Sequence, residues 1–200
     1  MEFNHFLSSY YPDTSYGADR HYADMLEQAI AAERFGYASV SIPEHHLMNI
    51  LMNPAPLQMA IKVASETRRI KIITSVVQLP LHDMRTYAGE VVLAELFTDG
   101  RLILGVGRGA FSIEMDWMGT PIETSREKFD ESLNVLQALL ESPGMKAVLG
   151  GEGKAKSLDS VAHLDGNAAG RKLLAPLGLA AGQGRQRSQV RAVRGESAAR

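Results

Sequence analysis

Hydrophobic and polar positions along the first 145 residues follow two alternating spacings. Short, nearly continuous apolar runs predict buried β-strands, and they cover residues 3–7, 38–42, 70–77 and 102–106. Between these runs, apolar residues recur every three or four positions with charges on the opposite side, which predicts amphipathic helices at 22–35, 57–67, 85–97 and 124–141. Strand and helix therefore alternate four times.

Local signals mark several helix ends. Gly36 suits the left-handed residue that stops the first helix. Thr124-Ser125-Arg126-Glu127 matches a capping box at the start of the fourth helix, and Ser142-Pro143-Gly144 is predicted to end it. Alternating strands and helices indicate an α/β fold with a parallel sheet and right-handed crossovers. Four such units make half of an eightfold (β/α)8 TIM-type barrel, or a small open sheet.

Composition divides the chain near residue 145. Residues 1–145 hold 11 Lys and Arg against 19 Asp and Glu, whereas residues 146–200 hold 10 against 4 and contain no Phe, Tyr, Trp, Ile or Met. Such a segment buries little apolar area against its ordering entropy. We therefore expect 1–145 to be a folded unit and 146–200 to be a tail that is disordered or translated out of frame, with the Ala/Gly/Arg bias that a GC-rich gene gives in a wrong frame.

The totals exclude some protein classes. The chain has 200 residues, a net charge of −2 and no cysteine, so disulfides and thiolate metal sites are ruled out. It has no apolar run of membrane-span length, and Met1-Glu2-Phe3-Asn4-His5 lacks the features of a signal peptide. We expect a cytoplasmic protein that binds neither nucleic acid nor membrane.

Polar residues follow the predicted strands at their carboxyl ends, where parallel-barrel enzymes have their catalytic residues. Pro43-Glu44-His45-His46 comes directly after the second strand. Thr74 and Ser75 lie in the third run, with Gln78 and His82 beyond it, and Gly107-Arg108-Gly109 ends the fourth. Because the carboxyl ends of barrel strands meet on one face, we expect these residues to form one site.

Each of these motifs can also be explained without a functional role. A tight turn with a surface arginine explains Gly107-Arg108-Gly109, packing explains Thr74 and Ser75, and His82 fits a solvated loop. A metal-dependent hydrolase using His45 and His46 is a further alternative. It is disfavoured because adjacent side chains point in different directions and rarely bind one ion.

Several segments together resemble the N-terminal half of the bacterial luciferase-like flavin-dependent monooxygenases. The matching pieces occur in family order over about 140 residues: 1–7, Ala32-Glu33-Arg34-Phe35-Gly36-Tyr37, Pro43-Glu44-His45-His46, Leu79-Pro80-Leu81-His82, Asp99-Gly100-Arg101-Leu102 and Gly105-Val106-Gly107-Arg108-Gly109. The resemblance implies a TIM barrel that binds reduced FMN at its C-terminal face and activates O2 to oxidise a small organic substrate.

The resemblance also implies roles for particular residues. His45 matches the catalytic histidine, a proton donor or acceptor near the flavin, and Arg108 matches a ligand of the flavin phosphate. Ser75 and Val76 fall where family members can hold a cis peptide under the flavin ring. The implied cofactor-binding set is Glu44, His46, Thr74, Ser75, Val76, Gly107 and Arg108, in which Glu44 and His46 orient His45 or shape the pocket. No metal ligand is implied.

The same resemblance leaves alternatives open. A deazaflavin (F420)-dependent oxidoreductase shares the barrel and these motifs, and a non-catalytic flavoprotein fragment is a third possibility. The family barrel needs four more strands and further phosphate ligands, and nothing after residue 145 resembles them. We therefore expect a truncated, inactive chain. The implied partners of the complete enzyme are a small-molecule substrate, a separate flavin reductase and a second copy in a homodimer.

Overall fold

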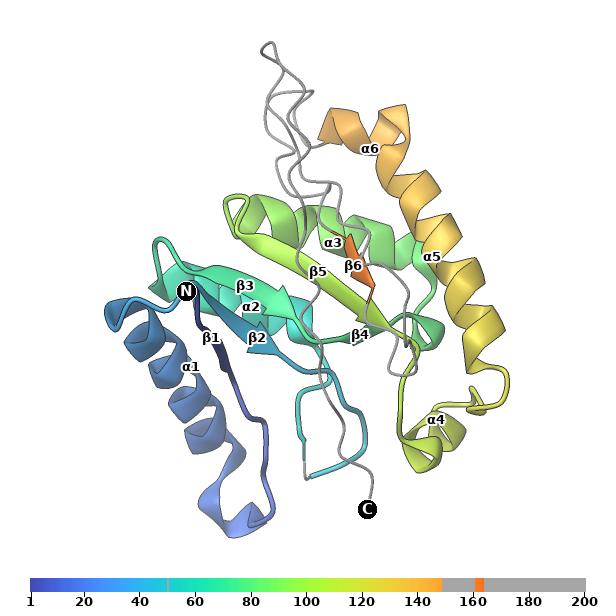
Figure 1. Ribbon diagram of the computed structural model, residues 1–200. Coiled ribbons are helices and arrows are strands. Elements are labelled where there is room, and N and C mark those ends of the chain that lie inside the picture. Colours follow the sequence, from blue (N-terminus) through green and yellow to red (C-terminus); the bar gives the residue numbers. More distant parts are fainter. Residues whose placement is uncertain (50, 149–160, 164–200) are drawn as a thin grey trace.

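The computed structural model describes residues 1–49, 51–148 and 161–163 (Figure 1). Within these residues, six strands form one sheet in which all pairs are parallel. The strands are β1 Asn4–Phe6, β2 Ser39–Ile42, β3 Lys71–Thr74, β4 Val77–Gln78, β5 Leu102–Gly107 and β6 Val161–His163. Their order is β1-β2-β3-β5-β4, with β6 paired to β5. The predicted parallel α/β sheet is confirmed.

The described residues form six helices, most of which cover one face of the sheet. They are α1 Ala18–Arg34, α2 Pro56–Glu66, α3 Met84–Phe97, α4 Ser112–Trp117, α5 Ser125–Glu141 and α6 Pro143–Val148, with short 3-10 turns η1 Thr14–Tyr16 and η2 Leu79–Leu81. Figure 1 shows α2 and α3 behind the strands, flanked by α1 and α5. No helix among the described residues is both long and apolar enough to cross a membrane.

The two faces of the sheet differ in chemistry because strand side chains alternate. Val40 and Ile42 belong to the hydrophobic core beneath the helices. Ser39 and Ser41 alternate with them in β2 and bond to Asn4 of β1: the Ser39 hydroxyl donates to Asn4 Oδ1, and Asn4 Nδ2 donates to Ser41 Oγ, each at 2.9 Å. The face away from the core helices is therefore polar and hydrogen-bonded here.

The third predicted strand is divided into β3 and β4. β3 pairs with β2 and β5 through residues 71–74, and β4 pairs with β5 through Val77 and Gln78. Between them, the Ser75–Val76 peptide bond is cis. The run 70–77 conceals this break because β-branched residues typical of strands lie on both sides of it.

Several predicted helix ends differ in detail. Gly36 has φ of +82°, which confirms the left-handed stop. The capping box at 124–127 is wrong: α5 begins at Ser125, but the Thr124 hydroxyl donates to the Pro121 carbonyl oxygen instead of capping the helix. The predicted stop at Ser142-Pro143-Gly144 is confirmed, because α5 ends at Glu141. Pro143 then opens the separate helix α6, where a proline at the first position loses no hydrogen bond.

The segment after residue 145 contributes a strand that periodicity did not predict. Val161–His163 pairs with β5 in parallel register, with Leu104 opposite Val161 and Val106 opposite His163. Three residues are too few to show an alternating pattern. The rest of the predicted tail, apart from residues 146–148, lies outside the described residues. The boundary at residue 145 and the predicted disorder of 146–200 stay predictions.

Candidate active site

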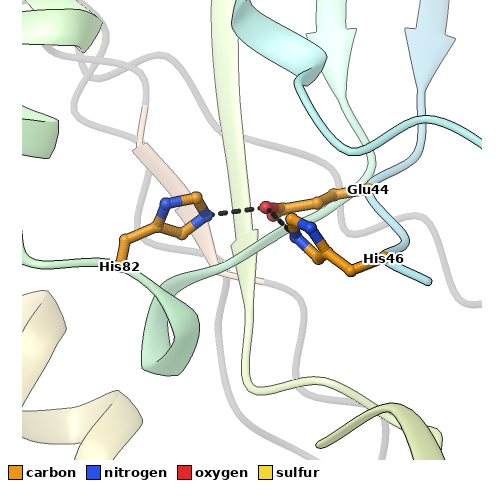
Figure 2. Close-up of side chains that lie close together, drawn as sticks. All are labelled: Glu44, His46 and His82. Carbon is orange, nitrogen blue, oxygen red and sulfur yellow. Dashed lines mark hydrogen bonds and ion pairs between the residues drawn. The ribbon is translucent and has the colours of Figure 1, made fainter. Parts of the chain in front are cut away.

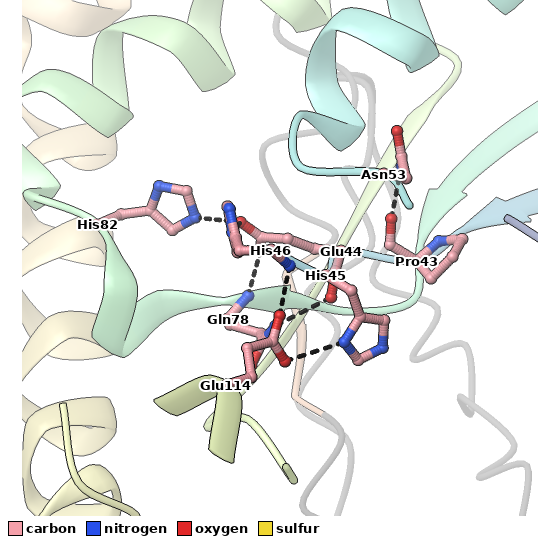
Figure 3. Close-up of polar contacts among 8 residues, drawn as sticks. All are labelled: Pro43, Glu44, His45, His46, Asn53, Gln78, His82 and Glu114. Atoms are coloured by element: carbon pink, nitrogen blue, oxygen red, sulfur yellow. Dashed lines mark hydrogen bonds and ion pairs between the residues drawn. The ribbon is translucent and has the colours of Figure 1, made fainter. Parts of the chain in front are cut away.

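The loop after β2 carries the Pro43-Glu44-His45-His46 motif, and Asn53 closes it. The backbone N–H of His45 donates to the Asn53 carbonyl oxygen at 3.1 Å. The Asn53 side-chain amide donates to the Pro43 carbonyl oxygen at 2.6 Å, and Asn53 itself is buried. These two bonds fix the backbone on both sides of Glu44, and Figure 3 shows the one between the Asn53 side chain and Pro43.

His45 pairs with Glu114, a residue of α4. Its Nδ1 lies 2.9 Å from Glu114 Oε2, and the other carboxylate oxygen accepts the backbone N–H of His46. The Glu114 side chain is fully buried, whereas the His45 side chain keeps 16% of its surface exposed. The Phe111 ring lies 5.1 Å from the His45 ring. A buried carboxylate thus holds one nitrogen of a histidine that still reaches the surface.

Glu44 contacts two other imidazoles (Figure 2). One carboxylate oxygen, Oε1, lies 2.9 Å from His46 Nε2 and 2.6 Å from His82 Nε2. The other oxygen accepts the backbone N–H of Gln78, whose side-chain amide donates to the Glu44 carbonyl oxygen at 2.9 Å. Because Glu44 is 1% exposed, its carboxylate is an internal cross-link between the end of β2 and the segment containing β4 and η2.

Hydrogen bonding determines the charge of both buried carboxylates. Burial by itself would raise the pKa of Glu44, but the bonds from His46 and His82 and from the Gln78 N–H lower it to about 2. Burial likewise opposes ionisation of Glu114, and its bonds to His45 and to the His46 backbone bring its pKa below the usual value. The bond to Glu44 raises the pKa of His46, against the effect of burial. Both glutamates are therefore anionic at neutral pH.

Glu44, His46 and His82 also have the composition of a metal-ligand set. Their ligand atoms lie within 4.8 Å of one another, and zinc accepts two imidazoles and a carboxylate. In this structure the same atoms bond directly to each other, so the carboxylate is satisfied without an ion. The alternative in which His45 and His46 share a metal does not fit, because these side chains bind different carboxylates.

The break between β3 and β4 lies beside this cluster. The Ser75 N–H donates to the Ile42 carbonyl oxygen at 2.7 Å. Thr74 and Val77, on either side of the cis bond, are fully buried, whereas Ser75 and Val76 are partly exposed. The Thr74 hydroxyl bonds to the backbone of Gly105. Ser75–Val76 is thus the accessible part of this strand end, and Thr74 is engaged within the sheet.

The turn after β5 requires glycine at position 109. Gly109 has φ of +88°. A Cβ there would lie 2.4 Å from Met115 Sδ and 2.7 Å from Gln78 Oε1. Glycine therefore allows both the backbone conformation and the close approach of α4 to β4. Arg108, just before it, is partly buried at the strand end.

Glu44 and His46 were predicted to orient His45 or to shape the pocket; their side chains form no hydrogen bond with the His45 side chain, and a role in shaping the pocket stays a prediction. Glu44 binds His46 and His82 and leaves His45 to Glu114. The strand ends do bring Glu44, His46 and His82 into one cluster, as expected. The cofactor contacts assigned to the remaining residues stay predictions.

Two residues of the site were missed in the sequence. Asn53 follows Leu51-Met52 and precedes Pro54, where it reads as part of a turn. Glu114 lies in α4, whose six residues are too few for a helical period. The available signal was a lone carboxylate between the apolar residues Ile113 and Met115.

Comparison with known proteins finds relatives of this chain. The family model of luciferase-like monooxygenases matches residues 1–188. The 4-hydroxyprotoasukamycin monooxygenase of Streptomyces nodosus subsp. asukaensis is 35% identical over 115 residues, which are 58% of this chain and 31% of the relative. The oxygenase component of a flavin-dependent trigonelline monooxygenase from Acinetobacter baylyi is 32% identical over 97 residues, 48% of this chain and 27% of the relative. The chain spans about a third of the length of these curated relatives.

Solved structures share the fold. The monooxygenase RslO1 from Streptomyces bottropensis has a TM-score of 0.66 at 25% identity, covering 71% of this chain and 44% of its own. The oxygenating constituent of 3,6-diketocamphane monooxygenase from Pseudomonas putida, in complex with FMN, has a TM-score of 0.64 at 21% identity, covering 70% and 40%. An F420-dependent secondary alcohol dehydrogenase reaches 0.58 at 22% identity, covering 71% and 42%. These matches confirm the predicted partial TIM barrel.

Proposed function

Because this chain belongs to the luciferase-like monooxygenase family, we propose that it acts as a flavin-dependent monooxygenase that uses reduced FMN and O2 to oxidise a small organic substrate. The inactive chain expected from the sequence is the alternative that the binding and turnover experiments below test. The observation that carries the proposal is the His45–Glu114 pair, 2.9 Å apart, just beyond the carboxyl end of β2. Catalytic side chains of α/β barrels stand at this end of the strands. An oriented and partly exposed histidine is suited to proton transfer near neutral pH.

FMN fits two features of this strand edge. The partly buried Arg108 lies in a glycine turn, and a guanidinium next to backbone amides matches the charge and geometry of a phosphate. Ser75 and Val76 are accessible between fully buried neighbours, so this peptide offers a surface to a planar ring. We assign Gly107 and Arg108 to the phosphate and Ser75–Val76 to the ring.

The remaining site residues hold the frame in this proposal. When bound, reduced FMN supplies the electrons for the reaction with O2. His45 exchanges the proton through Nε2, since Glu114 engages its Nδ1. Glu44 and His46 keep the β2 loop attached to Gln78. Thr74 keeps β3 against β5. Glu44, His46 and Thr74 therefore contribute to the cofactor site through the backbone that they fix.

Cofactor binding tests the proposal and its main alternative. The motifs around Glu44, His46 and His82 fit an F420-dependent oxidoreductase as well. We therefore compare fluorescence titrations of the chain with FMN and with F420. The proposal requires saturable FMN binding that is stronger than F420 binding. Preference for F420 would support the alternative, and binding of neither would favour a non-catalytic fragment.

Partners follow from the same proposal. One relative is named as an oxygenase component, which supports a separate reductase that supplies reduced FMN, and a cytoplasmic location is consistent with that supply.

We propose a homodimer, because α3 exposes Leu93, Leu96 and Phe97 at helical spacing, an apolar surface that a second copy would bury. Sedimentation velocity checks this: a monomer at micromolar concentration contradicts it.

A further inference from the structure

The geometry points to Glu114 as the positioning residue that selects the tautomer of His45, holding its proton on Nδ1 and leaving Nε2 as the proton acceptor. This inference rests on the proposed function, in which His45 transfers a proton. It concerns a pair that 69 residues separate in the chain. The assignment follows from which of three atoms, Glu114 Oε2, His45 Nδ1 and His45 Nε2, can donate or accept a hydrogen bond.

A carboxylate only accepts hydrogen bonds. Glu114 Oε2 lies 2.9 Å from His45 Nδ1, so this nitrogen must carry a proton. In the neutral imidazole the other nitrogen, Nε2, then has a free lone pair. The neutral ring is therefore set as a base at Nε2, and after it accepts a proton there, the anionic partner stabilises the imidazolium.

The second carboxylate oxygen defines the orientation of the pair. Glu114 Oε1 accepts the backbone N–H of His46, the residue next to His45. One carboxylate thus holds both the His45 ring and the backbone that carries it (Figure 3). The ring cannot turn about its side-chain bonds without losing the Nδ1 contact.

The scaffold holds Glu114 in place from behind. Its side chain is fully buried, and the next residue, Met115, is also fully buried. Met115 packs where a Cβ on Gly109 would lie, 2.4 Å from its sulfur. Gln78 of β4 lies beside Glu114 and helps to lower the pKa of its carboxyl. The carboxylate is thereby fixed by α4, β4 and the turn after β5.

Glu114→Gln reverses the proton pattern with little change in size. The amide oxygen must face the His46 N–H, because an NH2 group there would oppose a donor with a donor. The NH2 then faces His45 Nδ1, which must lose its proton and become the acceptor. The proton moves to Nε2, and the base becomes a donor.

The test is the tautomer of His45, read from 15N chemical shifts of the histidine-labelled chain at about pH 8.5, where ordinary imidazoles are neutral. The signal is assigned by its loss in His45→Asn. We expect the Nδ1–H tautomer in the parent and the Nε2–H tautomer in Glu114→Gln. Glu114→Asp keeps an acceptor-only carboxylate and should retain Nδ1–H. Asp116→Asn, which removes an exposed charge from the same helix, should match the parent.

An Nε2–H tautomer in the parent, or an unchanged tautomer in a folded Glu114→Gln, would overturn the inference. Turnover separates it from the proposed function. We expect Glu114→Gln to lower kcat about 100-fold with FMN affinity unchanged within about twofold. If the tautomer reverses while turnover persists in both Glu114→Gln and His45→Asn, the role of His45 is wrong and the positioning by Glu114 stands.

Discussion

The Thr74 hydroxyl forms two hydrogen bonds with the backbone of Gly105, donating to its carbonyl oxygen at 2.8 Å and accepting its N–H at 2.9 Å. A side chain thus replaces backbone pairing between β3 and β5 just before the cis bond. The strands are so close here that a Cβ on Gly105 would lie 2.1 Å from the Thr74 carbonyl oxygen. Any residue larger than glycine must push them apart.

Gly105→Ala should therefore destabilise the fold. The added methyl group meets backbone and not a movable side chain, so we expect a loss of about 1–3 kcal/mol in the free energy of unfolding. Urea denaturation measures it. Gly89→Ala is the matched control, because nothing lies within 4 Å of its Cβ in α3 and alanine favours a helix by about 0.5–1 kcal/mol. Equal effects of the two substitutions would contradict the close contact.

The Glu44 cluster should make stability depend on pH. The pKa of Glu44 is about 2 in the folded chain, against an ordinary value of 4.5. A carboxyl whose pKa is lower in the folded state stabilises the fold at pH values above its unfolded-state pKa. This contribution is lost as pH falls through the folded-state pKa. We expect the free energy of unfolding to fall between pH 4.5 and about 2. His46 acts in the opposite sense, because its pKa is raised in the folded chain. Its contribution to stability is present below pH 6.5, the ordinary pKa of histidine, and is lost as pH rises through its folded-state pKa.

Glu44→Gln isolates the acidic part of this dependence. It should flatten the stability profile below pH 4.5, whereas Glu123→Gln, at an exposed position, should leave it unchanged. Glu44→Ala leaves two partly buried imidazoles without their partner and should cost about 3–5 kcal/mol at neutral pH. Urea denaturation across the pH range checks both. A parent-like acid slope in Glu44→Gln would show that another carboxylate dominates.

Arg108→Ala should weaken FMN binding. Loss of a charge-assisted contact to phosphate costs about 1.5–3 kcal/mol, or about 10-fold to 150-fold in Kd. Fluorescence titration measures it, with Arg20→Ala, an exposed arginine of α1, as control. The variant's Tm must stay near that of the parent, so that altered binding is not altered folding. The same FMN affinity in variant and parent would remove Arg108 from the phosphate site.

Metal chelation should change nothing. Because the Glu44 carboxylate is satisfied by His46, His82 and Gln78, EDTA dialysis should leave Tm and FMN affinity as they were. Added Zn²⁺ should not raise Tm either, since it would have to displace these hydrogen bonds. A Zn²⁺-dependent rise in Tm that disappears in His82→Ala would instead establish a metal site at the cluster.

Sequence patterns were sufficient for the alternating strands and helices of the first 145 residues and for most residues of the candidate site. The strand carrying Ile72 and the helix face of Phe129 and Leu136 were predictable, because burial against one core imposes a regular spacing. The motif at Glu44–His46 was predictable from its place after a strand. Glu114 was not, because its partner lies 69 residues away and its short helix has no period of its own.

The central claim is that His45 transfers a proton in a flavin site, and single-turnover oxidation tests it most directly. The chain is loaded with reduced FMN without oxygen and mixed with O2-saturated buffer, and flavin absorbance follows reoxidation. We predict that His45→Asn binds reduced FMN within about twofold of the parent but slows reoxidation of the bound flavin about 100-fold or more, the usual contribution of a positioned acid or base. Equal reoxidation rates in parent and variant, with FMN bound in both, would contradict the account.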